Sequence, residues 1–261
     1  MRNFLLEIKH RNSVLYWFGW GCLATFLILA TVSCFSNIQV SGVNAWHKPM
    51  KFALSIWLYL WTMAWFMPYF PDSKSKTRIV WWMIIIMFIE LGSIIVQASR
   101  GTLSHFNQDG FLNIAVFQLM GMAIAANTFI LIYFVIKVAK NDSPSLNPKI
   151  KLAIAWGIWI LIFASFEGFV MGAILKHTVG ANDGSPGIPF LNWSKVAGDL
   201  RVAHFVGIHA MQIVPLAGFL IFKYLPENIQ SNGIKLFGIL YALMVAGLFL
   251  QAMNGVPVFG Y

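Results

Sequence analysis

The chain alternates between long apolar runs and short polar segments. Each apolar run is close to the roughly 20 residues that a helix needs to cross the hydrocarbon of a bilayer. The runs cover residues 13–35, 52–70, 78–99, 111–138, 150–175, 201–223 and 233–252. This pattern predicts an all-α polytopic integral membrane protein, a seven-transmembrane-helix bundle in which residues 1–261 form a single domain.

The first apolar run follows a short basic segment that contains Arg2, Lys9 and Arg11. A secretory signal peptide has a shorter apolar core and a small-residue cleavage site. The sequence ATVSCFS imitates such a site, but the run is long enough to span a bilayer. We therefore interpret it as a retained first helix.

Composition agrees with a membrane protein, because 59% of the residues are hydrophobic and only 10% are charged, against about 25% charged in soluble domains. Both cysteines, Cys22 and Cys34, fall in the first apolar run. This placement argues against a disulfide framework and against a cysteine-based metal site. The chain contains no P-loop, GxGxxG, HExxH, CxxC or GxSxG pattern, which excludes nucleotide-driven transport, the common zinc-protease geometry and the α/β-hydrolase route.

The net charge of +9 is explained by topology rather than by nucleic acid. The N-terminal segment and the loops after the second, fourth and sixth runs hold 12 of the 18 lysines and arginines. Because basic residues favour cytoplasmic loops, the N-terminus is predicted inside and the C-terminus outside. We expect an integral protein of a bacterial inner (plasma) membrane, in contact with the lipid bilayer, with no nucleic-acid partner and with its site facing outward.

Polar and titratable residues gather toward the predicted outer face. Five of the six histidines lie there: His47, His105, His177, His204 and His209. Carboxyl and amide side chains accompany them: Glu90, Gln97, Asp109, Glu167, Asp183, Asp199 and Gln212. The cytoplasmic loops have the composition of ordinary solvated turns, so the outer half is the predicted site.

Three of these groups reach a similar depth. With a rise of about 1.5 Å per residue, Glu90, Glu167 and His209 lie about 12–15 Å inward of the outer ends of their helices. An unpaired charge in hydrocarbon costs several kcal/mol, so these groups should point into the bundle. His204 and His209 are about 140° apart around a regular helix, whereas His209 and Gln212 share a face. Pro215 is a candidate for a local distortion of that helix.

These positions give a set of candidate site residues. The candidate metal ligands are His204 and His209, followed by His105 and His47, and the candidate catalytic carboxylates are Glu90 and Glu167. Arg100, Arg201 and Lys48 are candidates for haem propionates or an anionic substrate. Supporting roles are assigned to Gln97, His177, Asp183, Asp199 and Gln212. The alternative is that these groups form interhelical hydrogen bonds that stabilise the bundle.

The segment from about 176 to 200 combines turn-forming glycines and prolines with large apolar residues. A linker that only connects two helices does not need the apolar residues. We therefore expect an ordered loop at the outer face that covers the outer cavity.

Three functions are compatible with these residues. The first is a membrane oxidoreductase centred on haem b or on a non-haem metal ion (iron, copper or zinc), acting on a quinol or another lipid-soluble or small substrate. The second is a metal-dependent membrane hydrolase of lipid or amide bonds, with Glu90 or Glu167 as general base. The third is a proton-coupled transporter or receptor without metal, in which Glu90, Glu167 and His209 titrate. The oligomeric state is left open.

The seven-span plan with histidines and acids resembles the adiponectin-receptor and alkaline-ceramidase group of zinc lipid hydrolases. The resemblance is architectural. Proteins of that group use two histidines four residues apart on the last helix, whereas the segment HFVGIH sets His204 and His209 five apart on the sixth. The activity of the group is therefore not transferred to this chain.

Overall fold

The structure is a computed structural model, and it describes residues 2–143 and 146–260. The described residues form an all-helical fold, joined by short turns and by two small antiparallel strand pairs. The chain divides into two compact units, Met1–Ile130 and Leu131–Tyr261. The division falls inside a long helix, α5 (Gly110–Ala139), which begins in the first unit and ends in the second. The prediction of a single domain stays a prediction.

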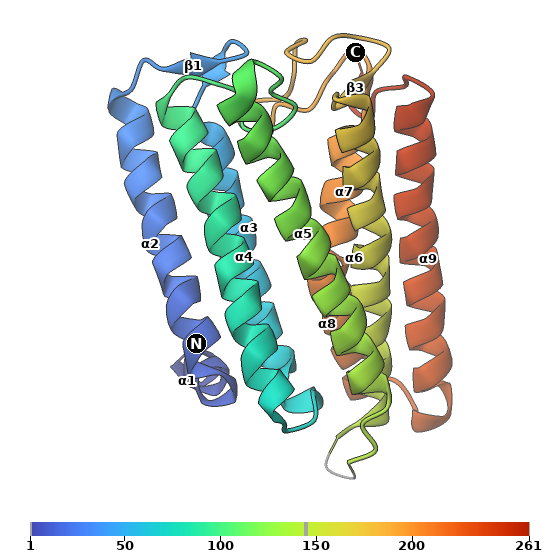
Figure 1. Cartoon of the computed structure of the whole chain (residues 1–261). Coiled ribbons are helices and arrows are strands. Elements are labelled where there is room, and N and C mark those ends of the chain that lie inside the picture. Colours follow the sequence, from blue (N-terminus) through green and yellow to red (C-terminus); the bar gives the residue numbers. More distant parts are fainter. Residues whose placement is uncertain (1, 144–145, 261) are drawn as a thin grey trace. The chain divides into compact units, whose positions relative to one another are not determined.

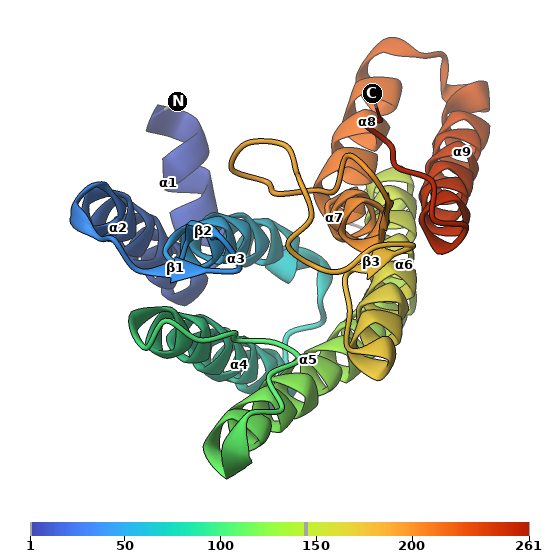
Figure 2. The same ribbon diagram turned by 90° about the horizontal axis from the view of Figure 1, so that it is seen from above.

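The first unit consists of α1 (Arg2–Arg11), α2 (Ser13–Phe35), β1 (Gln39–Val40), β2 (Val43–Asn44), α3 (His47–Phe66), the 3-10 turn η1 (Met67–Tyr69), α4 (Lys74–Ser99) and the first part of α5. Figures 1 and 2 show α2, α3 and α4 side by side, with successive helices antiparallel. The most extensive helix contact in this unit is between α2 and α3.

Asn12 caps the start of α2, and the neighbouring Arg11 connects α1 to α3. The Asn12 side chain accepts a hydrogen bond from the Leu15 amide at 2.9 Å, which satisfies one of the free N–H groups of the first turn. Arg11 pairs with Glu7 at 2.7 Å and donates to the Trp65 carbonyl at 2.9 Å. Arg11 therefore ties α1 to the end of α3.

A close contact of α2 with α3 is built around Trp61. Its ring stacks on Tyr16, with centroids 5.7 Å apart, and its indole N–H donates to the Tyr16 carbonyl at 3.2 Å. Gly19 leaves the space that this indole occupies, since a Cβ there would collide with it. A small residue opposite a large aromatic one lets the two helices approach closely.

The turn between α2 and α3 is a two-residue hairpin. Ser41 and Gly42 both have positive φ, 51° and 76°, the backbone that such a tight turn requires. After the hairpin, the Asn44 amide donates to the carbonyls of Ser33 and Ser36 at the end of α2. These bonds satisfy carbonyls that a helix end otherwise leaves free.

The second unit consists of the rest of α5, α6 (Pro148–Ile174), β3 (Thr178–Val179), β4 (Gly198–Asp199), α7 (Leu200–Ile208), α8 (Ala210–Tyr224) and α9 (Glu227–Met253). Helix α6 packs against α7, α8 and α9 (Figure 2). Asn147 caps its start, with Pro148 at the first helical position.

Small residues let α6 and the α7–α8 pair approach closely. A Cβ at Gly207 would collide with Ala164, a Cβ at Gly218 with Ala153, and a Cβ at Gly157 with the backbone of α8. Small residues at a helix interface favour van der Waals packing between backbones, which is a main source of helix association in membranes.

The predicted helix 201–223 is broken. Helices α7 and α8 meet at His209 with a bend of 46°. The Val206 carbonyl, in the last turn of α7, accepts a hydrogen bond from the Tyr241 hydroxyl of α9 at 2.8 Å. A side chain that occupies a carbonyl of the helix ladder is a recognised cause of a kink. The break precedes Pro215 by more than one turn, so the expected distortion lies earlier in the chain than the proline.

Among the described residues, five helices are long and apolar enough to cross a membrane: α2, α4, α5, α6 and α9. The bent α7–α8 pair meets the same criterion as one span, which gives up to six. These helices are compatible with an integral membrane protein. Helix α3, which covers residues 52–66 of the predicted span 52–70, begins earlier, at His47, and is not among them. The seven-span count and the N-in orientation stay predictions.

Candidate functional site

The two histidines of the α7–α8 pair belong to the second unit. The Nδ1 atom of His204 lies 2.7 Å from the Ala164 carbonyl, so Nδ1 carries the proton and donates it to that oxygen. The imidazole packs on Gly168, where a Cβ would come within 3.0 Å of the ring. His204 thus joins α7 to α6, and its Nε2 atom is left with a lone pair.

His209 lies at the helix break, between α7 and α8. Its ring makes an edge contact with Phe205, with centroids 4.5 Å apart, and its side chain bonds to that of Gln212. The contact with Gln212 agrees with the face that the two residues were predicted to share. His204 therefore lies in α7 and His209 at the break that follows it.

Glu167 is buried on α6, with its residue only 2% exposed. Neither carboxyl oxygen has a hydrogen-bond partner among the described residues. It shares the buried stripe of α6 with Ala164 and Met171, but among the described residues no ion pair joins it to a histidine. A buried carboxyl group without partners is costly when charged, so a proton or a ligand has to neutralise it.

The loop after α6 is held by two carboxylates. Asp199 is 1% exposed and accepts hydrogen bonds from the Ser194 amide at 2.7 Å and the Arg201 amide at 3.0 Å. The Arg201 guanidinium reaches both oxygens of Asp199, at 2.6 and 2.9 Å, and donates to the Asn192 carbonyl. Arg201 therefore has a structural set of partners, which leaves less of its guanidinium for an external anion.

Asp183 organises the start of the same loop. It accepts from the amides of His177 and Thr178 and from the Thr178 hydroxyl, and it pairs with the His177 imidazole at 2.7 Å. Burial raises the pKa of Asp183, but the hydrogen bonds and charge of His177 and the Thr178 hydroxyl outweigh it. The pKa of this carboxyl is held below its ordinary range, and it is charged at neutral pH.

The strand pair and an aromatic contact complete the loop. Thr178 pairs with Asp199 and Val179 with Gly198 in the two-stranded sheet. Trp193 stacks on Phe259, with centroids 6.1 Å apart, and meets Phe205 edge-on at 5.4 Å. Backbone pairing and apolar contacts therefore hold segment 176–200 against α7 and the C-terminal segment.

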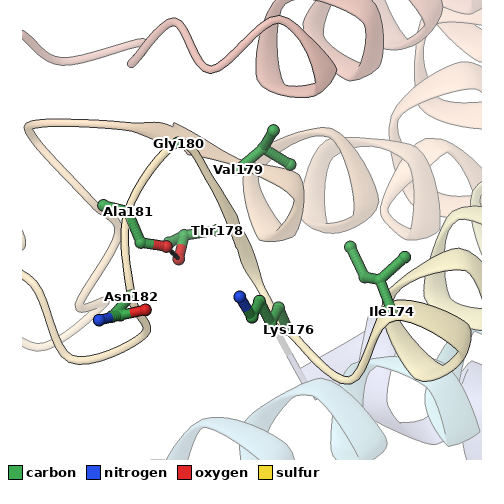
Figure 3. Close-up of a pocket in the computed structure, with 7 residues that line it drawn as sticks. All are labelled: Ile174, Lys176, Thr178, Val179, Gly180, Ala181 and Asn182. Carbon is green, nitrogen blue, oxygen red and sulfur yellow. Dashed lines mark hydrogen bonds between the residues drawn. The ribbon is translucent and has the colours of Figure 1, made fainter.

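A pocket of about 570 Å³ opens beside this loop. Figure 3 shows Lys176 between Ile174 on one side and the turn of Thr178, Ala181 and Asn182 on the other. Val179 and Gly180 complete the lining. None of the predicted metal ligands or catalytic carboxylates lines this pocket.

In the first unit, the predicted anion-binding residue Arg100 is fixed by two amides. Its guanidinium donates to Gln97 at 2.6 Å and to Asn113 at 3.1 Å, and Gln97 donates to Asn113 at 3.0 Å. Gln97 is fully buried. This network joins the end of α4 to the start of α5. Asn113 was not among the predicted residues, although its position inside an apolar run is the signal that selected Glu90 and Glu167.

Lys48 and His105 form a second polar group of the first unit. The Lys48 ammonium lies 3.2 Å from Nδ1 of His105, and the Ser104 hydroxyl lies 3.1 Å from the same atom. Lys48 also acts electrostatically on Glu90 of α4, which is 5% exposed and whose Oε1 has no hydrogen-bond partner among the described residues. Lys48 thus joins the first turn of α3 to the loop that contains His105.

The predicted site residues therefore separate into two sets. Lys48 contacts His105 in the first unit, and His209 bonds to Gln212 in the second. His47 lies at the first position of α3. In residues 2–143 and 146–260, no three side chains of the His, Cys, Asp or Glu type are arranged to hold a metal ion. A haem iron needs only one or two histidines, so this geometry bears on a bare-metal site and not on haem.

The comparisons with known proteins give no family for the chain. No protein-family model, no curated protein and no solved structure matches it.

Proposed function

We propose that the chain is a proton-coupled membrane transporter that uses Glu167 as a proton-exchanging group. The supporting observation is the Glu167 carboxyl group, which is buried on an apolar helix with both oxygens unpartnered among the described residues. Inside a membrane protein, an ionisable residue is costly to bury, and such residues commonly mark ion or proton pathways. Structural carboxylates of the same chain, Asp183 and Asp199, are instead surrounded by donors.

The broken α7–α8 helix supports the same proposal. Helix breaks at membrane depth expose backbone polar groups, and they are tolerated where protein or a water-filled cavity satisfies those groups. Here the break carries His209, and α6 with Glu167 packs directly against both halves. A carrier needs a movable element beside its exchanging group, and the α7–α8 junction is a candidate for it.

A second candidate is the haem- or metal-centred oxidoreductase. Its supporting observation is the bond from Nδ1 of His204 to the Ala164 carbonyl, because metal-bound histidines commonly donate the other ring N–H to a carbonyl. His204 would hold haem b through Nε2, and the haem would supply one-electron chemistry for a quinol or another lipid-soluble substrate. Of the three proposed propionate partners, Arg100 and Arg201 already bind internal acceptors, and Lys48 contacts His105. No observation favours the metal-dependent hydrolase, which needs three ligands.

One experiment separates the two candidates. Protein is purified without chelator from cells supplied with haem, iron, copper and zinc, and its metal content, optical spectrum and infrared carboxyl bands are recorded across pH. The proton-coupled function predicts a protonated-carboxyl band that disappears reversibly as pH rises and is missing in Glu167→Gln. Glu227→Gln, which changes an exposed carboxyl paired with Lys149, is the matched control and should leave the band unchanged.

Two results would overturn this proposal. Stoichiometric haem or metal that is lost in His204→Ala would establish the oxidoreductase instead. A Glu167 carboxyl that keeps one protonation state over the whole pH range in which the protein stays folded would remove the exchanging group.

A further inference from the structure

The pocket of the second unit lies where α6 ends and segment 176–200 begins. Helix α6 is long and apolar enough to cross a membrane, and Lys176 follows its last residue by two positions. A lysine at the end of such a helix can reach the lipid headgroups. The pocket has a volume of about 570 Å³, and the Lys176 side chain points across it toward the turn of residues 178–182 (Figure 3).

This pocket is lined by hydrogen-bond donors without partners in the part of the chain that the structure describes. The Lys176 ammonium makes no ion pair or hydrogen bond with a described residue. The backbone amides of Gly180, Ala181 and Asn182, which line the same pocket, also donate to no described residue. The Asn182 side chain adds an amide that can present its NH2 group. An ammonium group together with unpaired backbone amides is a set of donors with which proteins bind phosphate.

Asp183, which follows the turn, is occupied by other donors. Its Oδ1 atom accepts from the amide and the hydroxyl of Thr178, and its Oδ2 atom lies 2.7 Å from Nδ1 of His177. The Thr178 hydroxyl also lies 3.0 Å from the Ala181 carbonyl, which closes the turn. Asp183 therefore pairs with His177 and not with Lys176, whose ammonium is available to an anion.

An exposed apolar stripe of α6 leads to the pocket. Ile174 lines the pocket and is 41% exposed, and Phe163 and Phe166 of the same helix are 47% and 56% exposed. Phe163 and Ile174 are separated by about three helical turns, so they share one face of α6. Acyl chains of a bilayer can lie along such a face. From the ammonium, the unpaired amides and this stripe, we infer that the pocket binds a phosphate group, supplied by the headgroup of a phospholipid. The site does not include Glu167 and goes beyond the proposed transport function.

The test follows amide hydrogen exchange by mass spectrometry on the full chain in maltoside micelles without phosphate. Addition of phosphatidylglycerol should slow exchange of the Gly180, Ala181 and Asn182 amides about tenfold, because a hydrogen bond to a charged phosphate has to open first. Lys176→Met should remove this protection, and Lys176→Arg should keep it, since arginine also binds phosphate. Lys140→Met removes an equal charge just after the end of α5 and is the matched control, which should keep the protection.

Two further additions identify the source of the phosphate. Dioleoylglycerol carries acyl chains and no phosphate, so it should give no protection. Inorganic phosphate alone should give little protection if the lipid supplies the group. Full protection by inorganic phosphate would support the phosphate site and would assign its ligand to free phosphate instead.

Three results would overturn the inference: no protection by either phosphate compound, equal protection by dioleoylglycerol and phosphatidylglycerol, or equal protection in Lys176→Met and the unmodified protein. Exchange of the Thr178 amide, which donates to Asp183, reports whether the loop stays folded in Lys176→Met and should be unchanged. Glu167→Gln should not alter the protection, so the phosphate site and the proposed transport function can fail separately.

Discussion

Carboxyl groups of this chain have two kinds of surroundings. Asp183 and Asp199 each accept hydrogen bonds from backbone amides and from a cationic or titratable partner. Glu90 and Glu167 are buried with at least one oxygen that has no partner among the described residues. Charge-assisted hydrogen bonds stabilise the ionised form, so the two aspartates hold a loop in place. The two glutamates lack that stabilisation and are suited to exchanging a proton.

Asp183→Asn should loosen the loop in a pH-dependent way. The folded-state pKa of Asp183 lies below the unfolded value of about 3.9, so its contribution is complete above that pH and is lost as pH falls through the folded value. At neutral pH we expect about tenfold faster hydrogen exchange at the amides of His177 and Thr178 in the variant. Mass spectrometry of the exchanged protein provides the measurement.

The matched control for this prediction is Asp72→Asn, which removes an exposed pair with Lys76 and should change loop exchange little. The difference between Asp183→Asn and the unmodified protein should shrink under strongly acidic conditions. If the difference stays constant as pH falls, the carboxylate charge is not what holds the loop.

Sequence identified which residues are unusual but not what they contact. His204 and His209 stand out as histidines in an apolar run, yet the partner of His204 is the backbone carbonyl of Ala164, 40 residues away. Every residue has a backbone carbonyl, so residue types do not reveal which carbonyl a histidine contacts. Arg100 binds Gln97 and Asn113. Gln97 was predicted as a supporting residue and Asn113 was not, and the sequence predicted neither contact with Arg100.

At the scale of elements, helix bounds follow local signals where caps are present. The predicted helix 13–35 matches α2, which the Asn12 cap starts at Ser13. Helix α3 begins at His47, five residues before the predicted start at residue 52. The apolar pattern missed this first turn because its sequence, HKPMK, contains a histidine and two lysines. The sequence pattern did not place the break at His209, where the Tyr241 hydroxyl of α9 binds the Val206 carbonyl and α7 packs closely against α6.

A matched pair of glycine substitutions examines the packing of the broken helix. In Gly207→Ala, the new methyl group would collide with Ala164, and we expect the free energy of unfolding to fall by about 1–3 kcal/mol. In Gly247→Ala on α9, no atom lies within 4 Å of the new Cβ, so stability should stay the same or rise by up to about 1 kcal/mol. Unfolding in detergent micelles gives both values. Equal stability of the two variants would mean that α6 and α7 do not need their close approach.

At the scale of the whole molecule, composition and several long apolar helices are compatible with an integral membrane protein, whereas the span count depends on α3. Five helices, or six with the bent pair, satisfy length and apolarity among the described residues, and α3 does not. Its 20 residues include Lys48 and Lys51, together with three tryptophans and one tyrosine. Aromatic residues of this kind favour the membrane interface, and lysine side chains can extend toward it, so the low apolarity of α3 is compatible with a spanning helix.

The predicted topology gives α3 a definite test. If α3 spans the membrane and the N-terminus is inside, reporters fused after Gly42 and after Asp183 will report the outer compartment, and a reporter fused after Lys76 will report the cytoplasm. The physical reason is the excess of lysine and arginine, 12 of 18, in the N-terminal segment and the loops assigned to the inside. Gly42 and Lys76 flank α3, so a shared compartment for these two reporters would mean that α3 does not cross.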